Sequence, residues 1–129
     1  MAINSNKKGS RYERKAVKLL EGLGYEARRS QQYQGVALEG AGDLHTDLDG
    51  KVRFEVKGGY NDTNLTSAQT KKWVQTARDE TPEGTEWVLL WQKSRMDWVA
   101  LVDWHGESYL AFTDVEAAIN FALAVRDYQ

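Results

Sequence analysis

Two carboxylates and an ammonium group in the middle of the chain have the types and order of a metal-binding catalytic set. Asp43 is followed twelve residues later by Glu55, which opens the triplet Glu55-Val56-Lys57. Mg²⁺ takes hard oxygen ligands and keeps several waters, so one or two carboxylates and a phosphate commonly complete its site. A cation held by Asp43, Glu55 and the Val56 carbonyl would polarise a phosphate and lower the pKa of a bound water. Lys57 would position that water and offset developing negative charge.

The same residues also have an ordinary structural explanation. Acids and lysines alternate on the solvent face of many hairpins, so an Asp followed later by Glu-x-Lys is common by chance. Histidine adds little to the metal hypothesis, because His45 and His105 have no third histidine to complete an imidazole site and are expected to be structural. The absence of cysteine excludes thiolate sites and disulfides.

The strands that would carry the two carboxylates are predicted to form a hairpin. Residues 43–48 and 52–57 alternate polar and apolar side chains around Asp49-Gly50, which is a strong turn signal. A strict two-residue turn would put the two acids on opposite faces, whereas a three-residue loop would bring both acids and the lysine onto one face. Both registers remain open.

The pattern of the whole chain predicts nine elements in the order α, β, β, β, α, β, β, β, α. Ser10, Thr66 and Thr113 are expected to begin the helices as N-caps, each with Glu or Gln three residues later. This order predicts an α/β fold with a central mixed sheet flanked by helices. Tryptophans on the strands and on the second helix are expected in the core. The strands are expected at residues 25–29, 43–48, 52–57, 86–92, 98–104 and 108–112.

Length and composition favour one domain over residues 1–129. The chain has 129 residues, 41% of them hydrophobic, which suffices for one core and is too little for two ordinary domains. Its longest apolar runs fall far below the roughly 20 residues of a membrane helix, and the N-terminus lacks the apolar stretch of a signal peptide. We therefore expect a cytoplasmic protein without a membrane partner.

Charge is distributed unevenly along the chain. The net charge is -2, but residues 1–30 carry a net +5 and the remainder a net -7. Residues 1–9, with Lys7 and Lys8, are predicted to be a flexible basic arm. A basic end and a carboxylate-rich remainder suit an enzyme that grips phosphates at one place and binds cations at another. A solvated basic helix explains the charge equally well.

Several segments in the first part of the chain together resemble the archaeal-type Holliday junction resolvases, which belong to the PD-(D/E)xK nuclease superfamily. The resemblance runs from about Lys7 to Ala77 and depends on both order and spacing. The chain departs from the superfamily pattern by having Ala41-Gly42 in place of a proline before the aspartate, and by a longer loop between Ser30 and Asp43. The matching segments are Lys8-Gly9-Ser10-Arg11-Tyr12-Glu13-Arg14, Gly24-Tyr25, Arg29-Ser30, Asp43-Leu44 and Phe54-Glu55-Val56-Lys57.

The resemblance implies a restriction-endonuclease-like core with Glu13, Asp43, Glu55 and Lys57 in the active site. Glu13 has a competing explanation, because Ser10-x-x-Glu13 also has the form of a capping box. The implied cofactor is Mg²⁺, with Mn²⁺ expected to substitute for it. The residues implied to bind DNA are Lys7, Lys8, Arg11, Arg14, Arg29 and Ser30.

Three functions are compatible with these observations. The preferred hypothesis is an endodeoxyribonuclease that resolves four-way DNA junctions, acting as a homodimer because a two-fold junction needs two opposed cuts. One alternative is a nuclease of the same superfamily that acts on other DNA, such as a restriction, repair or flap substrate. The other alternative is a DNA-binding module without catalytic activity.

Overall fold

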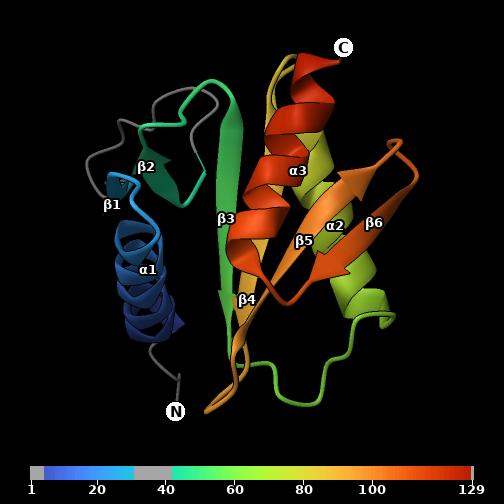
Figure 1. The fold of residues 1–129 in the computed structure, drawn as a ribbon. Coiled ribbons are helices and arrows are strands. Elements are labelled where there is room, and N and C mark those ends of the chain that lie inside the picture. Colours follow the sequence, from blue (N-terminus) through green and yellow to red (C-terminus); the bar gives the residue numbers. More distant parts are fainter. Residues whose placement is uncertain (1–4, 31–41, 129) are drawn as a thin grey trace.

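The computed structural model describes residues 5–30 and 42–128, with side chains described from residue 9 onward. Its elements follow one another in the predicted order (Figure 1). The strands at residues 86–92, 98–104 and 108–112 have the predicted bounds. The predicted loop over residues 31–41 lies outside the described residues. The elements are α1 (Ser5–Gly22), β1 (Ala27–Arg29), β2 (Leu44–Thr46), β3 (Val52–Gly58), α2 (Ala68–Glu80), β4 (Glu86–Gln92), β5 (Trp98–Trp104), β6 (Ser108–Phe112) and α3 (Val115–Asp127).

A four-stranded mixed sheet forms the centre of the fold, with strand order β3-β4-β5-β6. β3 and β4 run parallel because α2 connects them as a crossover, whereas the β4–β5 and β5–β6 pairs are antiparallel. β1 and β2 form a separate two-stranded antiparallel sheet beside α1. The predicted α/β fold with a mixed sheet flanked by helices is confirmed.

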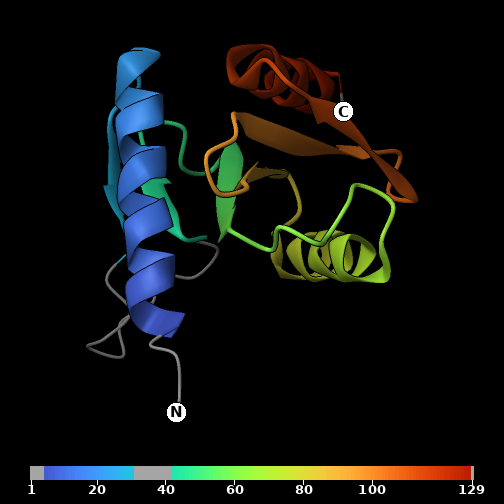
Figure 2. The ribbon, with the colours of Figure 1, turned by 90° about the horizontal axis from the view of Figure 1, so that it is seen from below.

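Helices α2 and α3 cover opposite faces of the sheet, and α1 lies beside the β3 edge (Figure 2). β4 is buried on both faces, which explains its continuous apolar run. Val88 and Leu90 belong to the core shared with α1 and α3. Trp87, Leu89 and Trp91 belong to a second core under α2. The odd-numbered positions of β3 therefore face α2, because parallel pairing aligns Arg53 with Trp87.

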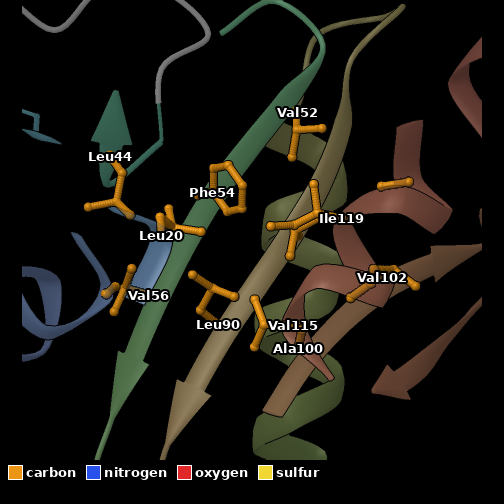
Figure 3. Packing of buried hydrophobic residues seen from close by; sticks show 14 of the residues in the cluster. Leu20, Leu44, Val52, Phe54, Val56, Leu90, Ala100, Val102, Val115 and Ile119 are labelled. Carbon is orange, nitrogen blue, oxygen red and sulfur yellow. The ribbon is translucent and has the colours of Figure 1, made fainter. Parts of the chain in front are cut away.

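The larger core extends from α1 across β3 to α3 (Figure 3). Leu20, Phe54 and Ile119 are each no more than 1% exposed and represent these three elements. Burying a side chain of this size contributes roughly 1.5–3 kcal/mol. This core fixes the position of α1 against the central sheet, and with it any group that α1 presents.

Tyr12 sets the distance between α1 and β3. Its side chain is 2% exposed, and its ring covers the backbone of Gly58 at the end of β3. A Cβ atom at residue 58 would lie 1.9 Å from the ring, so only glycine permits this approach. Glu13 follows Tyr12 on the helix, so the contact between Tyr12 and Gly58 also brings Glu13 toward β3.

The predicted hairpin between residues 43–48 and 52–57 is wrong in both registers. β2 pairs with β1, matching Arg28 to His45, and β3 pairs with β4. Between them, Leu48 O accepts bonds from the amides of both Lys51 and Val52, so the chain turns through a wider loop than a two-residue hairpin. The backbone groups of β2 therefore bond to β1. Asp43, just before β2, is the residue whose hydrogen bonds connect this small sheet to β3.

The helices begin at residues other than those predicted. α1 starts at Ser5, so the part of the expected arm from Ser5 to Gly9 is helical, while residues 1–4 lie outside the described residues. A glycine disfavours a helix by only about 1 kcal/mol, which the packing of α1 on the core exceeds. α2 and α3 are capped by Ser67 and Asp114, each one residue later than expected. Among the described helices, none combines the length and apolar character that crossing a bilayer requires.

The tryptophans follow the predicted burial with one exception. Trp73, Trp87 and Trp91 are 6%, 2% and 3% exposed and belong to the core under α2. Trp104 is 42% exposed, and its ring stacks with Phe121 of α3 at 6.2 Å. The expectation of a core role for Trp104 was wrong, because it is the last residue of β5 and its ring lies at the margin of the α3 face, against Phe121.

Candidate active site

Asp43 joins the β1–β2 sheet to the central sheet. Its carbonyl accepts from the Ser30 amide at 3.0 Å, and its own amide donates to the Phe54 carbonyl at 2.9 Å. Its side-chain Oδ2 accepts from the Val56 amide at 2.7 Å. Two of these three bonds fix Asp43 against the outer edge of β3, and the third holds it to the end of β1. Because the N–H and C=O of one strand residue point to the same side, the Val56 carbonyl also faces this edge.

Gly42 allows Asp43 to approach β3 so closely. A Cβ atom at residue 42 would lie 2.1 Å from the Phe54 carbonyl oxygen. The Gly42 carbonyl is also held, because Ser30 Oγ donates to it at 2.7 Å. A proline, which the superfamily pattern has at this position, would carry a Cβ atom into the backbone of β3. The departure from the pattern therefore has a steric reason in this fold.

Glu55 lies on the α2 face of β3 with 14% of its side chain exposed. Burial and the nearby charge of Asp43 raise the pKa of Glu55 to about 8, and a hydrogen bond between the two carboxyl groups acts in the same direction. The Arg53 guanidinium donates to Glu55 Oε1 and partly opposes that rise. Asp43 and Glu55 are thus close neighbours whose negative charges would repel one another if both were ionised.

Glu13 approaches the same carboxylates from α1. Burial raises the pKa of Glu13, the charge of Asp43 adds to the rise, and the hydrogen bond from Arg29 opposes it. Arg29 Nε donates to Glu13 Oε1 at 3.0 Å, and its Nη2 donates to Ser10 Oγ at 2.8 Å. The capping-box interpretation is therefore wrong, because Ser10 and Glu13 lie inside a helix that begins at Ser5 and both bind Arg29.

The ammonium of Lys57 is held by an aromatic ring. Its Nζ lies over the indole of Trp73 in α2, 5.6 Å from the ring centroid. Trp73 is itself held edge-on by Tyr60 at 4.7 Å and by Trp91 at 5.2 Å. The aromatic group of α2 thus determines where the ammonium lies relative to β3.

Sequence reasoning missed two residues that contact the predicted set. Arg53 was not predicted as a site residue, yet it binds the Glu55 carboxylate directly. Trp73 was assigned to the core, and it also contacts Lys57. The available signal for Arg53 was a charged side chain two residues before Glu55, in a strand whose charged residues alternate with apolar ones. No comparable signal marked Trp73, because its contact with Lys57 joins different elements.

A basic concave surface of about 610 Å³ lies between α1 and β1. It brings together three of the residues predicted to bind DNA, Arg14, Arg29 and Ser30. Lys18 and Arg28 also line it and were not predicted, whereas Glu21 is its one acidic lining residue among those described. We call this surface the basic groove. Four cationic side chains facing one hollow can bind successive phosphates of a nucleic acid.

Arg11, which was also predicted to bind DNA, is not among the described residues that line the basic groove. Arg11 is exposed on α1, and its guanidinium lies 5.2 Å from the centroid of the Tyr12 ring. The backbones of Lys7 and Lys8 belong to the first turns of α1, but their side chains lie outside the described part of the chain.

Oxygen ligands for a divalent cation are present at Asp43 and Glu55. Among the described residues, no three histidine, aspartate or glutamate side chains are grouped closely enough to hold an ion by themselves. A cation here would therefore be held by two carboxylates and the Val56 carbonyl, with water completing its coordination, which is a donor set that Mg²⁺ accepts. The raised pKa of Glu55 fits this assignment, because a cation would relieve the repulsion between the carboxylates.

The histidines lie elsewhere, as expected for structural residues. His45 is 9% exposed, and its Nδ1 lies 3.1 Å from Asp49 Oδ2 in the turn after β2. His105 occupies the turn between β5 and β6 with a φ of 57°. His45 thus bonds to Asp49 and His105 packs on Trp104, and among the described contacts neither histidine bonds to Asp43 or Glu55.

Comparison with known proteins shows a likeness in fold to solved structures. No protein-family model matches the chain, and no curated protein matches its sequence. Its fold is similar to that of Hjc, a Holliday junction resolvase from the archaeal hyperthermophile Archaeoglobus fulgidus. The two chains are 22% identical, the match covers 87% of this chain and 93% of Hjc, and the TM-score is 0.47. At this degree of similarity the function has to be argued from the site.

Proposed function

We propose that this protein is a metal-dependent endodeoxyribonuclease that cuts branched DNA, with four-way junctions as its substrate. The observation that carries the proposal is the convergence of Glu13, Asp43 and Glu55 from α1, the β2 end and β3, with Lys57 on the same strand. Three acids brought together from distant parts of the sequence, with raised pKa values at two of them, are typical of a catalytic site.

Each residue has a distinct task in the proposed reaction. Asp43, Glu55 and the Val56 carbonyl would hold Mg²⁺, for which Mn²⁺ would substitute. When bound, the ion would polarise the phosphate and supply an acidic water. Lys57 would place its ammonium beside the negative charge that develops during hydrolysis. Glu13, tied to Arg29, would orient groups on the α1 side of the site.

The basic groove supplies a phosphate-binding surface next to these residues. Arg29 belongs both to the groove and to the ion pair with Glu13, so the groove borders the carboxylates directly. Phosphate contacts position DNA without reading its sequence, which suits an enzyme that recognises DNA shape. The preference for a four-way junction over other DNA rests on the sequence motifs, and the fold by itself does not determine the substrate.

Resolution of a junction requires two cuts on opposed strands, and we propose that a homodimer makes them. A symmetric dimer would present two equivalent sites to a substrate that itself has two-fold symmetry. Mass measurement by light scattering, with and without junction DNA, tests this part of the proposal separately from the chemistry.

The decisive experiment compares cleavage of an immobile four-way junction, a flap and a linear duplex in Mg²⁺ or EDTA on a denaturing gel. Wild-type protein should give paired nicks in the junction with Mg²⁺ alone. Asp43→Asn keeps an oxygen that can accept from the Val56 amide but removes the charge, and it should lower the cleavage rate at least about 100-fold. Junction affinity should persist in this variant, because the carboxylate would hold the ion and not the phosphate.

Asp79→Asn is the matched control, since Asp79 is an exposed aspartate of α2 that bonds to Gln75. It should cleave like wild type. Equal cutting of all three substrates would replace the resolvase by a nuclease of broader substrate range. Binding without cleavage would replace the enzyme by a DNA-binding module, and full activity in Asp43→Asn would refute the proposed site.

A further inference from the structure

The guanidinium of Arg53 ties Glu55 to the end of helix α2. Arg53 lies two positions before Glu55 on the same face of β3, and 8% of its side chain is exposed. Its Nη1 donates to Glu55 Oε1, and its Nη2 donates to Glu80 Oε2 at 3.2 Å. Glu80 is the last residue of α2. The buried arginine therefore connects a carboxylate of the candidate site to a helix that covers the sheet.

We infer that Arg53 is a positioning residue, which holds the Glu55 carboxylate in place for a divalent cation; this inference rests on the proposed function. By binding one oxygen of Glu55, the guanidinium restricts the rotation of its side chain and leaves the second oxygen for the ion. Without that link, repulsion between Asp43 and Glu55 would turn the Glu55 side chain away. The planar fork of arginine can donate to Glu55 and Glu80 together, which a lysine ammonium does less well.

A positive charge beside a cation site also has an opposing effect, because it repels the incoming ion. In this structure Glu80 offsets that charge, since it accepts from the same guanidinium. Loss of Arg53 would make the local group more negative by one charge, which favours an incoming cation, while it would free the Glu55 side chain to rotate. We expect the positioning effect to be the larger one.

The test measures Mn²⁺ binding to DNA-free protein by isothermal titration calorimetry for wild type, Arg53→Met and Arg53→Lys. Arg53→Met keeps a side chain of comparable reach without the donors and should weaken Mn²⁺ binding at least tenfold. Arg53→Lys should recover part of the loss, because it restores the charge and one donor. Single-turnover cleavage at saturating Mg²⁺ should fall in the same order, with DNA affinity unchanged.

Arg78→Met is the matched control for loss of a half-buried arginine. Arg78 lies on α2 and donates to Asp103 Oδ1 at 2.9 Å and to the Ser108 carbonyl at 3.0 Å, near β5 and β6 instead of the carboxylates. It should lower the thermal denaturation midpoint without altering Mn²⁺ affinity. This comparison separates a general loss of stability from a specific loss of metal binding.

Each result decides between the possible explanations. If Arg53→Met lowers the denaturation midpoint but binds Mn²⁺ as tightly as wild type, or more tightly, the positioning role is refuted while the nuclease proposal stands. If wild-type protein itself fails to bind Mn²⁺, the proposed metal site fails and this inference fails with it. Weaker binding in Arg53→Met but not in Arg78→Met supports the inference.

Discussion

At the scale of single residues, the site depends on Glu55, a carboxyl group whose surroundings disfavour its ionised form. Glu55 is confined by β3 beneath it, Asp43 beside it and Arg53 along the strand. Its pKa of about 8 means that the metal-free protein keeps a proton there at neutral pH. A carboxyl group whose ionisation is disfavoured by its surroundings suits the proposed binding of a cation, which would offset the charge.

This residue gives a prediction about stability and pH. The folded pKa of Glu55 is about 8 against an ordinary value of 4.5, so the folded state binds the proton more tightly than the unfolded state. In EDTA, its contribution to stability is therefore lost as pH rises from about 4.5 to 8. Glu55→Gln cannot ionise and should melt about 5 °C or more above wild type at pH 9, with little difference at pH 4.5.

Thermal denaturation of both proteins over this pH range provides the check, with Glu107→Gln, at an exposed turn position, as the control. Mn²⁺ should reduce the difference in melting temperature between Glu55→Gln and wild type at pH 9, because the ion favours ionised Glu55 in wild type. Parallel pH profiles for Glu55→Gln and wild type would show that the environment of Glu55 is not the one described.

At the scale of elements, the site depends on how closely α1 approaches β3. The contact between Tyr12 and Gly58 sets this distance, and the adjacent Glu13 reaches the carboxylates only if the helix lies there. A second close approach, of Gly42 to the Phe54 carbonyl, sets the position of Asp43 in the same way. Two glycines without special turn conformations thus bring three separate elements together.

Gly58→Ala should destabilise the protein by about 1–3 kcal/mol, because its Cβ atom would overlap the Tyr12 ring and the core would have to shift. The matched control is Gly22→Ala, where a Cβ atom would meet nothing within 4 Å. That change should be neutral or raise stability by up to about 1 kcal/mol, since alanine favours a helix. Urea denaturation measures both, and equal stability of Gly58→Ala and wild type would contradict the packing described.

At the scale of the whole molecule, an acidic protein carries a basic surface beside an acidic site. The net charge is -2, yet the basic groove collects Arg14, Lys18, Arg28 and Arg29 on one side of α1. Under the proposed function, such separation would let the groove attract DNA while the carboxylates attract cations.

Replacing Arg14, Lys18 and Arg28 by glutamine should weaken junction binding equally for junctions of different sequence. The slope of log affinity against log salt should become shallower by about 2–3, because fewer counterions are released. Arg29 is left unchanged, since it also binds Glu13 and Ser10. The control replaces Lys51, Lys71 and Lys72, which are exposed elsewhere, so both triple variants lose the same charge. Fluorescence anisotropy across salt concentrations measures the junction affinity of both variants. Equal losses of affinity would show that the basic groove is not the surface that binds the junction.

The periodicity of side chains predicted most of the elements because it records local burial. The strands Glu86–Gln92, Trp98–Trp104 and Ser108–Phe112 have the predicted bounds. In the turn between the last two, His105 and Gly106 have φ values of 57° and 72°, the positive values that tight hairpin turns require. Helix starts were predicted less well, because Ser and Thr near a helix end compete as caps and packing of the helix decides among them.

The order and spacing of Asp43, Glu55 and Lys57 already determined the chemistry that the protein is proposed to perform, since oxygen ligands and an ammonium define it wherever they meet. Tertiary structure alone decided how they meet. The hairpin expected to join the acids does not form, because β1 takes the hydrogen bonds of β2, and Asp43 reaches β3 through backbone links instead. The contacts of Glu55 with Arg53, and of Lys57 with Trp73, depend on a strand face and a distant helix, which local sequence cannot place in space.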